Sequence, residues 1–248
     1  MVSGDGIVRV TLNRPDKRNA LNRATIERLT AEFEAAASNS NARCILLVGE
    51  GNDFCSGADL AELQQIRDAS LLDNLEDARR LGRLFLLMRR HPLPVVAAVQ
   101  GRALAGGCGL ATASDLVLAR ADALFGYPEV NLAFVPAMVM SLLRRSVSEK
   151  RAFELLTTGK MISATEAFEA GLVNAVYPVE GFWERVEEFV SSLASKSSSA
   201  IRLTKQLLYQ IDVMPVEAAI ECGAQVNAIA RMTEDCRRGI DAFLKRPR

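Results

Sequence analysis

Short apolar runs alternate with amphipathic segments through the first half of the chain, and this alternation limits the folds open to it. Residues 6–13 alternate between apolar and polar side chains and are rich in β-branched residues, as a half-buried strand is. Residues 43–49 and 92–101 are continuous apolar runs, which are typical of strands buried on both faces. Between them lie a helical pattern that begins after Asn22 and a long amphipathic helix at residues 71–90. This order predicts stacked βαβ units in an α/β protein.

The second half of the chain is mostly helical in pattern. Two more short strands are expected at residues 114–120 and 123–129. The helices are expected at residues 136–144, 149–158, 164–170, 180–194, 200–210, 216–232 and 234–244. The serine-rich segment 191–200 has the composition of a loop between two of these helices. We therefore expect a core domain at residues 1–195 and a C-terminal helical region at residues 196–248, which covers either a ligand or a neighbouring subunit.

Composition argues against several classes of protein. Thirty basic residues balance thirty acidic ones among 248, so no global field draws the chain to nucleic acid or to a membrane surface. No apolar run approaches the roughly 20 residues that a membrane-spanning helix needs, and the first residues resemble neither a signal nor a transit peptide. The five cysteines have no CxxC spacing, which argues against a zinc site or a disulfide framework and for the cytoplasm. We expect no metal site.

His91 is the single histidine of the chain. Catalysis of the Ser-His-Asp or Cys-His kind would have to use this residue, and the sequence holds no GxSxG motif to accompany it. We interpret His91 as a residue at the end of a helix, next to a turn that contains prolines. Nucleophilic catalysis with a histidine base is therefore disfavoured.

The stretch AGGCG, residues 105–109, places three glycines at the start of a helical pattern. Exposed N–H groups at a helix N-terminus can hold a phosphate, the glycines can allow close packing, or an N–H can be aimed at a developing oxyanion. Neither GxxxxGK[ST] nor a GxGxxG motif with a later acidic residue is present, so a phosphate-binding site is disfavoured. Taken alone, the stretch favours close packing.

A second turn of small residues, FCSGADL at residues 54–60, also follows a buried strand and precedes a helix. Two such turns from neighbouring βαβ units can each direct one N–H to the same point. That is the geometry of an oxyanion hole, whose donors converge where negative charge develops.

Four segments in this order, residues 13–22, 54–60, 99–130 and 159–178, resemble the crotonase family, the enoyl-CoA hydratase/isomerase superfamily. The resemblance implies a crotonase-like ββα spiral of repeated βαβ-type units with a helical C-terminal trimerisation region. It also implies an acyl-CoA thioester substrate, with coenzyme A as part of the substrate and no separate cofactor. Homotrimers, often paired into hexamers, are usual in this family, and the apolar stripe of residues 216–232 belongs either to such an interface or to the core of one chain.

The resemblance also assigns roles to individual residues. Ala58 and Gly106 would supply the two backbone N–H groups that stabilise a thioester enolate. The residues implied to line the bound substrate are Ala58, Asp59, Leu60, Gly106 and Gly107. Lys17 and Arg18 either meet the phosphates of coenzyme A or form a solvated surface pair.

The acid–base residues depart from the usual family pattern. Hydratases of the family carry two glutamates; the second corresponds to Glu129, whereas Gly109 stands in place of the first. Glu129 is thus the one matched general acid and base. We expect the missing side chain at Gly109 to free space for a branched or carboxylated acyl chain, since the arrangement is similar to that of bacterial methylglutaconyl-CoA hydratases.

We therefore expect an enoyl-CoA hydratase/isomerase that hydrates a 2-enoyl-CoA. Migration of a double bond from C3–C4 to C2–C3 needs a single base and is the alternative on chemical grounds. A non-catalytic protein that binds acyl-CoA or acts as an assembly partner, and a thioester hydrolase or decarboxylase on the same scaffold, are further alternatives.

Overall fold

Five parallel strands form the larger of two sheets in the computed structural model, which describes residues 6–245 apart from the side chain of Leu60. The strands are β1 (Ile7–Leu12), β2 (Cys44–Gly49), β3 (Val95–Val99), β5 (Leu116–Arg120) and β8 (Ala175–Tyr177), and they lie side by side in chain order. Every neighbouring pair is parallel, with Ile7 opposite Cys44 and Ile45 opposite Val95. Parallel neighbours in chain order confirm the predicted stacking of βαβ units.

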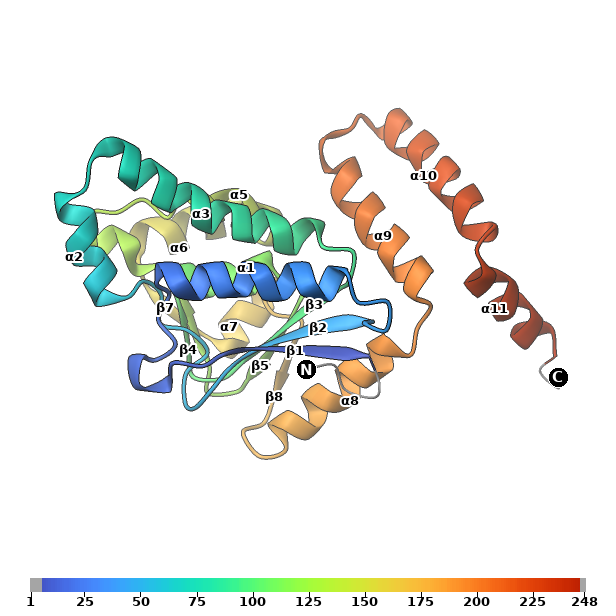
Figure 1. Ribbon diagram of the computed structural model, residues 1–248, viewed down its shortest axis with the longest axis horizontal. Coiled ribbons are helices and arrows are strands. Elements are labelled where there is room, and N and C mark those ends of the chain that lie inside the picture. The colour runs from blue at the N-terminus through green and yellow to red at the C-terminus, as the bar shows by residue number, and fades with distance from the viewer. Residues whose placement is uncertain (1–5, 246–248) are drawn as a thin grey trace.

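Helices cover both faces of this sheet, because successive side chains of a strand point to opposite faces. In β1, Val8 and Val10 belong to the main core, whereas Ile7 belongs to a second core on the other face. The second core is closed by Phe182 and Val186 of a helix that lies across that face (Figure 1). The runs in β2 and β3 are entirely buried, as their continuous apolar pattern predicts.

Eleven α-helices occur in the described part of the chain. They are α1 (Arg23–Ala37), α2 (Leu60–Asp68), α3 (Leu71–Arg90), α4 (Gly106–Ala113), α5 (Ala137–Ser146), α6 (Glu149–Thr158), α7 (Ala164–Glu169), α8 (Phe182–Ala194), α9 (Ser198–Gln210), α10 (Val216–Arg231) and α11 (Glu234–Leu244). The side chain of Asn22 accepts a hydrogen bond from the Thr25 N–H and caps α1, as expected. None of the described helices combines the length and the apolar character needed to cross a membrane.

A smaller sheet lies beside the first and consists of β4 (Arg102–Leu104), β6 (Leu124–Gly126) and β7 (Met161–Ser163), in the order β4-β6-β7. Strands β4, β7 and β8 are not predicted from the sequence, because three residues are too few to establish a period. The strand predicted at residues 123–129 is wrong in its second half. Pro128 begins a 3₁₀ helix, η2 (Pro128–Leu132), since proline fixes φ and cannot donate to a sheet. Two further 3₁₀ turns are η1 (Pro15–Lys17) and η3 (Ile211–Val213).

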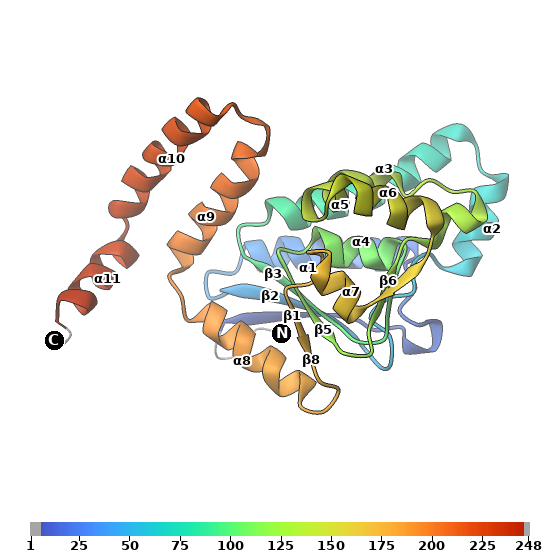
Figure 2. The same cartoon turned by 180° about the vertical axis from the view of Figure 1, so that it is seen from behind.

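Helices α9 to α11 lie to one side of the sheets, and both views show α10 and α11 extending away from them (Figures 1 and 2). Lys205 of α9 is the one buried residue in these three helices, and its ammonium group donates to the Asp115 carboxylate at 2.7 Å and to two backbone carbonyls. Asp115 also accepts a hydrogen bond from the N–H of Val95, the first residue of β3. The domain boundary at residue 195 stays a prediction.

Candidate active site

The turn between β2 and α2 is bonded directly to β4. The Cys55 N–H donates to the Arg102 carbonyl, and the Cys55 carbonyl accepts from the Leu104 N–H, each at 2.9 Å. Gly57 has φ +95°, and a Cβ there would lie 2.8 Å from the Ala105 Cβ. A side chain at position 57 would therefore push the two turns apart. These contacts hold the two turns against each other.

The backbone N–H groups of Ala58 and Gly106 have no partner among the hydrogen bonds of the described residues. Leu21 pairs with Ala58 in a parallel bridge, in which Leu21 donates to the Gly57 carbonyl and accepts from the Asp59 N–H. In this pattern the N–H of Ala58 itself points away from Leu21. Gly106 is the first residue of α4, where a helix leaves its N–H groups unpaired.

Ala105, immediately before Gly106, has an unusual backbone conformation, with φ +49° and ψ −125°. A residue other than glycine in this region costs about 1–3 kcal/mol and persists only where its surroundings enforce it. The Ala105 N–H donates to the Gly126 carbonyl at 2.9 Å, which ties this turn to β6. Strand β6 leads into η2, which contains Glu129, and β4 leads into the turn before α4. Because β4 and β6 are adjacent, the start of α4 and Glu129 follow neighbouring strands.

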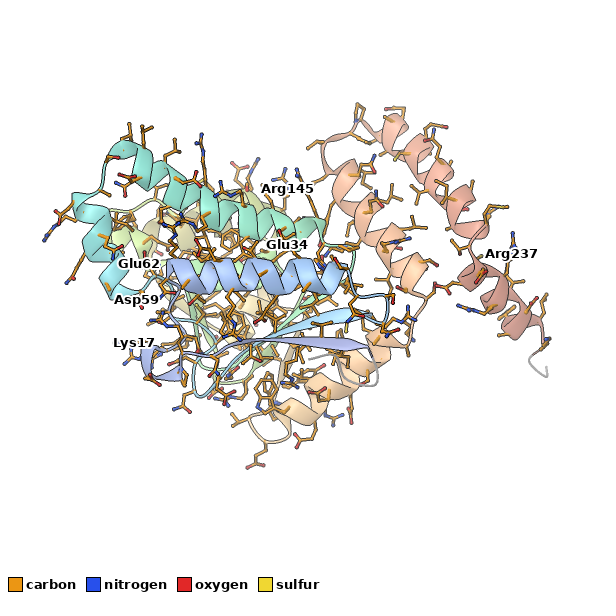
Figure 3. The ribbon with its side chains drawn as sticks, viewed as in Figure 1. Lys17, Glu34, Asp59, Glu62, Arg145 and Arg237 are labelled. Atoms are coloured by element: carbon orange, nitrogen blue, oxygen red, sulfur yellow. The ribbon has the colours of Figure 1, made fainter. Side chains whose placement is uncertain are left out.

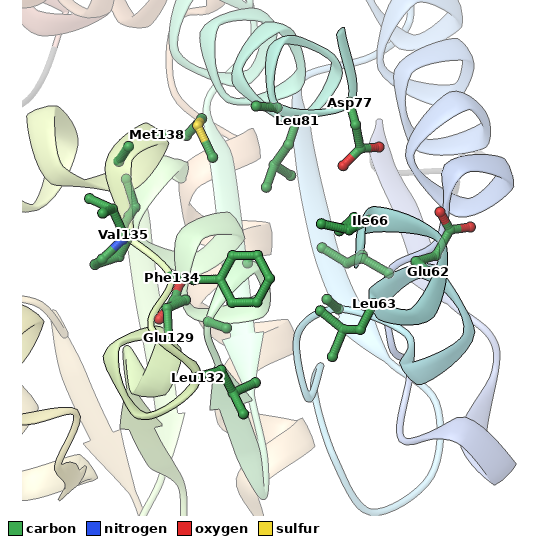
Figure 4. Close-up of a pocket in the computed structure, with 18 of the residues that line it drawn as sticks. Glu62, Leu63, Ile66, Asp77, Leu81, Glu129, Leu132, Phe134, Val135 and Met138 are labelled. Carbon is green, nitrogen blue, oxygen red and sulfur yellow. The ribbon is translucent and has the colours of Figure 1, made fainter. Parts of the chain in front are cut away.

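A cavity of about 760 Å³ brings Ala58, Gly106 and Glu129 together in one lining. Most of its remaining lining is apolar and comes from α2, α3, α5 and the segment before α5. In Figure 4, Glu129 lies beside Phe134, while Glu62 and Asp77 lie on the opposite side of the pocket, on α2 and α3. The three groups that the resemblance assigns to the chemistry thus share one space.

Glu129 is the most distinctive polar group of this cavity. Its Oε2 atom is buried and has no hydrogen-bond partner among the described residues. Burial raises the pKa of the Glu129 carboxyl above its ordinary value of 4.5, although a backbone N–H opposes part of this shift. A carboxyl group that is costly to ionise and faces a cavity is suited to exchanging a proton with a ligand.

Gly109 does not leave the empty space that we expected. A Cβ at position 109 would lie 2.5 Å from Cζ of Phe85, so the aromatic ring of α3 fills the volume that a side chain there would enter. Phe85 itself lines the cavity, whereas Gly109 does not. The expectation of room for a branched chain at Gly109 is therefore wrong. The sequence showed Phe85 only as part of an amphipathic helix, with no signal that it faces Gly109.

Gly107 lies behind the cavity wall and not in its lining. A Cβ at this position would lie 2.4 Å from the Cys55 carbonyl oxygen, so Gly107 is required for packing. At Gly106 a Cβ would meet only the ends of two leucine side chains, Cδ1 of Leu21 at 3.2 Å and Cδ2 of Leu81 at 3.6 Å. The two explanations for the glycine cluster therefore apply to different residues: close packing to Gly107 and Gly109, and an accessible N–H to Gly106.

The other predicted substrate-binding residues surround the beginning of α2. Asp59 caps α2 by accepting from the Ala61 N–H, and it also accepts from Arg14 at 2.7 Å. These two donors, the Ala61 N–H more than Arg14, hold the pKa of Asp59 below its usual range. Leu60 begins α2, but its side chain lies outside the described part. Lys17 and Arg18 are exposed, and Figure 3 shows Lys17 at the same end of the molecule as Asp59.

Neither the histidine nor the cysteines near the core offer a nucleophilic site. His91 ends α3, and its Nε2 lies 2.9 Å from the Phe33 carbonyl oxygen, which agrees with its interpretation as a helix-end residue. Burial lowers the pKa of His91. Burial also raises the pKa of the Cys55 and Cys108 thiols to about 12, so both stay protonated beside the cavity wall.

Comparisons with known proteins match this chain along nearly its whole length. A model of the family described as Enoyl-CoA hydratase/isomerase matches residues 3–248. The 2,3-dehydroadipyl-CoA hydratase of Escherichia coli is 35% identical over 97% of this chain and 92% of its own length. The crotonyl-CoA hydratase of Syntrophomonas wolfei is 33% identical over 95% of this chain and 90% of its own. The crystal structure of an enoyl-CoA hydratase of Mycobacterium smegmatis has a TM-score of 0.95 at 32% identity, covering 100% of this chain and 96% of that one. This likeness confirms the predicted crotonase-like fold, including its helical C-terminal region.

Proposed function

Because the chain belongs to the enoyl-CoA hydratase/isomerase (crotonase) family, we propose that it hydrates the C2–C3 double bond of a 2-enoyl-CoA, with Glu129 as general base and then general acid. The observation that carries this proposal is the buried, unpartnered Oε2 of Glu129 in the same cavity as the unpaired N–H groups of Ala58 and Gly106. The names of the two hydratase relatives support an enoyl-CoA substrate. Coenzyme A is part of that substrate, and the reaction as proposed uses no separate cofactor and no metal.

In this mechanism the thioester oxygen accepts hydrogen bonds from the N–H groups of Ala58 and Gly106. The Glu129 carboxylate takes a proton from a water molecule while the water oxygen bonds to C3. The electrons of the double bond move to the thioester oxygen, and the resulting enolate is stabilised by the two N–H groups. Glu129 then returns the proton to C2, so that one water has been added. The oxyanion donors supply about 10²–10³ in rate each, and the positioned carboxylate about 10²–10⁴.

Isomerisation of a 3-enoyl-CoA to a 2-enoyl-CoA is the second candidate. It is favoured by the Phe85 ring, which fills the space beside Gly109 where the first glutamate of a two-glutamate site would start. Without that carboxylate, Glu129 is the one glutamate left of the two that would together orient a water molecule. A single base suffices for isomerisation, since Glu129 removes a proton from C2 and returns it to C4.

Mass spectrometry of the products distinguishes these reactions. The protein is incubated with crotonyl-CoA, a 3-enoyl-CoA and 3-methylglutaconyl-CoA. A product heavier by one water from either 2-enoyl thioester supports hydration, whereas an unchanged mass with altered retention from the 3-enoyl thioester supports isomerisation. Release of free coenzyme A or loss of carbon dioxide indicates a hydrolase or a decarboxylase. Binding without turnover of any thioester contradicts both proposals and leaves a non-catalytic acyl-CoA-binding or assembly protein.

We also propose that α9 to α11 build the interface of a homotrimer, or of a hexamer formed from two trimers. The support is the number of large apolar side chains exposed on α10 and α11, among them Ile220, Ile229, Met232 and Phe243. Light scattering measures the assembly directly, and a monomeric mass contradicts the proposal. A cytoplasmic location stays a prediction.

A further inference from the structure

We propose that the pocket selects neutral, apolar acyl chains and rejects acyl groups that end in a carboxylate. The inference rests on the proposed function, since it takes the acyl part of a thioester to occupy the cavity that Ala58, Gly106 and Glu129 line. It concerns the rest of that lining, most of which comes from α2, α3 and α5. It also opposes the carboxylated substrate that the resemblance to methylglutaconyl-CoA hydratases predicts.

Acidic side chains outnumber basic ones around the pocket. Three carboxylates, those of Glu62, Asp77 and Glu129, line it, whereas Arg23 is the one basic residue in the described lining. The guanidinium group of Arg23 is already bonded to Glu27 at 2.8 Å. An entering carboxylate would therefore meet like charges and a cation that has a partner.

Arg80 is the next basic residue along this wall, and it is also engaged. Its guanidinium group lies 3.1 Å from Asp77 and 3.9 Å from Glu27. These two arginines lie among three carboxylates, those of Glu27, Glu62 and Asp77. Transfer of another carboxylate from water into such a place costs free energy that no free cation offsets.

Much of the remaining lining is apolar and offers no charge to pair with a carboxylate. Leu81 and Phe85 of α3 and Met138 of α5 lie there, and the Phe85 ring covers the glycine at position 109. Leu63 and Ile66 of α2 extend the apolar surface toward Glu62 (Figure 4). A methyl-terminated chain gains from burial against these side chains, while a carboxylate-terminated chain of equal length loses its hydration.

The test compares two thioesters that differ only at the end of a six-carbon acyl chain. Hexanoyl-CoA and adipoyl-CoA lack a double bond, so calorimetry measures their binding without turnover. We expect hexanoyl-CoA to bind at least about tenfold more tightly, a difference of about 1.4 kcal/mol in binding free energy. Equal binding, or tighter binding of adipoyl-CoA, overturns the selectivity. Binding of neither thioester contradicts the proposed function itself and removes the premise of the selectivity.

A pair of variants on α3 tests the cause of the selectivity. Asp77→Asn removes a lining carboxylate and releases Arg80, so it should raise the affinity for adipoyl-CoA relative to hexanoyl-CoA by about tenfold. Glu76→Gln removes the same charge one residue earlier, from an exposed side chain outside the lining that pairs with Arg83, and should leave this ratio unchanged. The same ratio in both variants would overturn the assignment of selectivity to the charges that line the pocket.

Discussion

The two sides of the cavity are built from different materials. We call Ala58, Gly106 and Glu129 the reaction wall; it consists of turns and strand ends held together by backbone hydrogen bonds. The acyl wall is formed by α2, α3, α5 and the segment before α5, and side chains alone shape it. Some of these side chains are large, apolar and exposed, such as Leu132 and Val135, at 62% and 66%.

This difference separates chemistry from substrate choice. The backbone that holds the reaction wall cannot easily change, because a side chain at Gly57 or Gly107 would clash with the facing turn. A residue of the acyl wall can change in size or charge while the two N–H groups keep their places. Members of one family can therefore keep the enolate chemistry and differ in the acyl groups they accept. The predictions that follow test this separation.

The largest effect is expected for Glu129→Gln. The variant keeps the shape of the reaction wall but cannot transfer a proton, so kcat should fall by about 10²–10⁴ while acyl-CoA affinity changes little. It should also unfold at the same or a higher temperature, because a buried carboxylate no longer has to ionise. Steady-state kinetics, calorimetry and thermal unfolding measure the three quantities, with Glu149→Gln at an exposed position as the control. An equal loss of affinity and turnover would instead indicate a structural role.

Gly106→Val tests the other part of the reaction wall. Its branched side chain would occupy the place of the thioester oxygen, and kcat/KM should fall by about 10²–10³. The chain should still fold, since a Cβ at this position meets only the ends of the Leu21 and Leu81 side chains. Gly107→Ala is the matched contrast, because its Cβ would overlap the Cys55 carbonyl and should destabilise the fold. A normal rate in Gly106→Val would refute the donor assigned to this residue.

The sequence predicted the reaction wall far better than the acyl wall. The turns at residues 54–60 and 105–109 demand small residues at fixed spacing, and such demands are visible in a single sequence. The long helices were also predictable, α3 and α6 to the residue, because their apolar period extends over several turns. The contact of Phe85 with Gly109 was not predictable, because it joins two helices whose crossing depends on the packing of the whole core.

Gly109→Ala tests the acyl wall where it meets α4. Its methyl group would overlap the Phe85 ring, which is buried, and the free energy of unfolding should fall by about 1–3 kcal/mol. Adding Phe85→Leu should restore much of this loss, because the smaller side chain leaves room for the new methyl group. Urea denaturation of both single variants and the double variant measures the coupling. Additive effects would mean that Phe85 does not determine which residue fits at position 109.

The pH dependence of the reaction connects the two walls, because the apolar surroundings supplied by both raise the pKa of Glu129. The base must be ionised, so kcat/KM should decrease as pH falls through a value above 4.5, by about tenfold per pH unit below it. Stability should change in the opposite sense, because the folded protein prefers the protonated carboxyl. Any stability gain of Glu129→Gln should therefore be present at neutral pH, shrink as pH falls below the raised pKa, and be lost once pH is below the ordinary value of 4.5. If kcat/KM instead decreases at the ordinary pKa of a glutamate, the Glu129 carboxyl is hydrated in the free protein. The acyl wall would then contribute nothing to the chemistry.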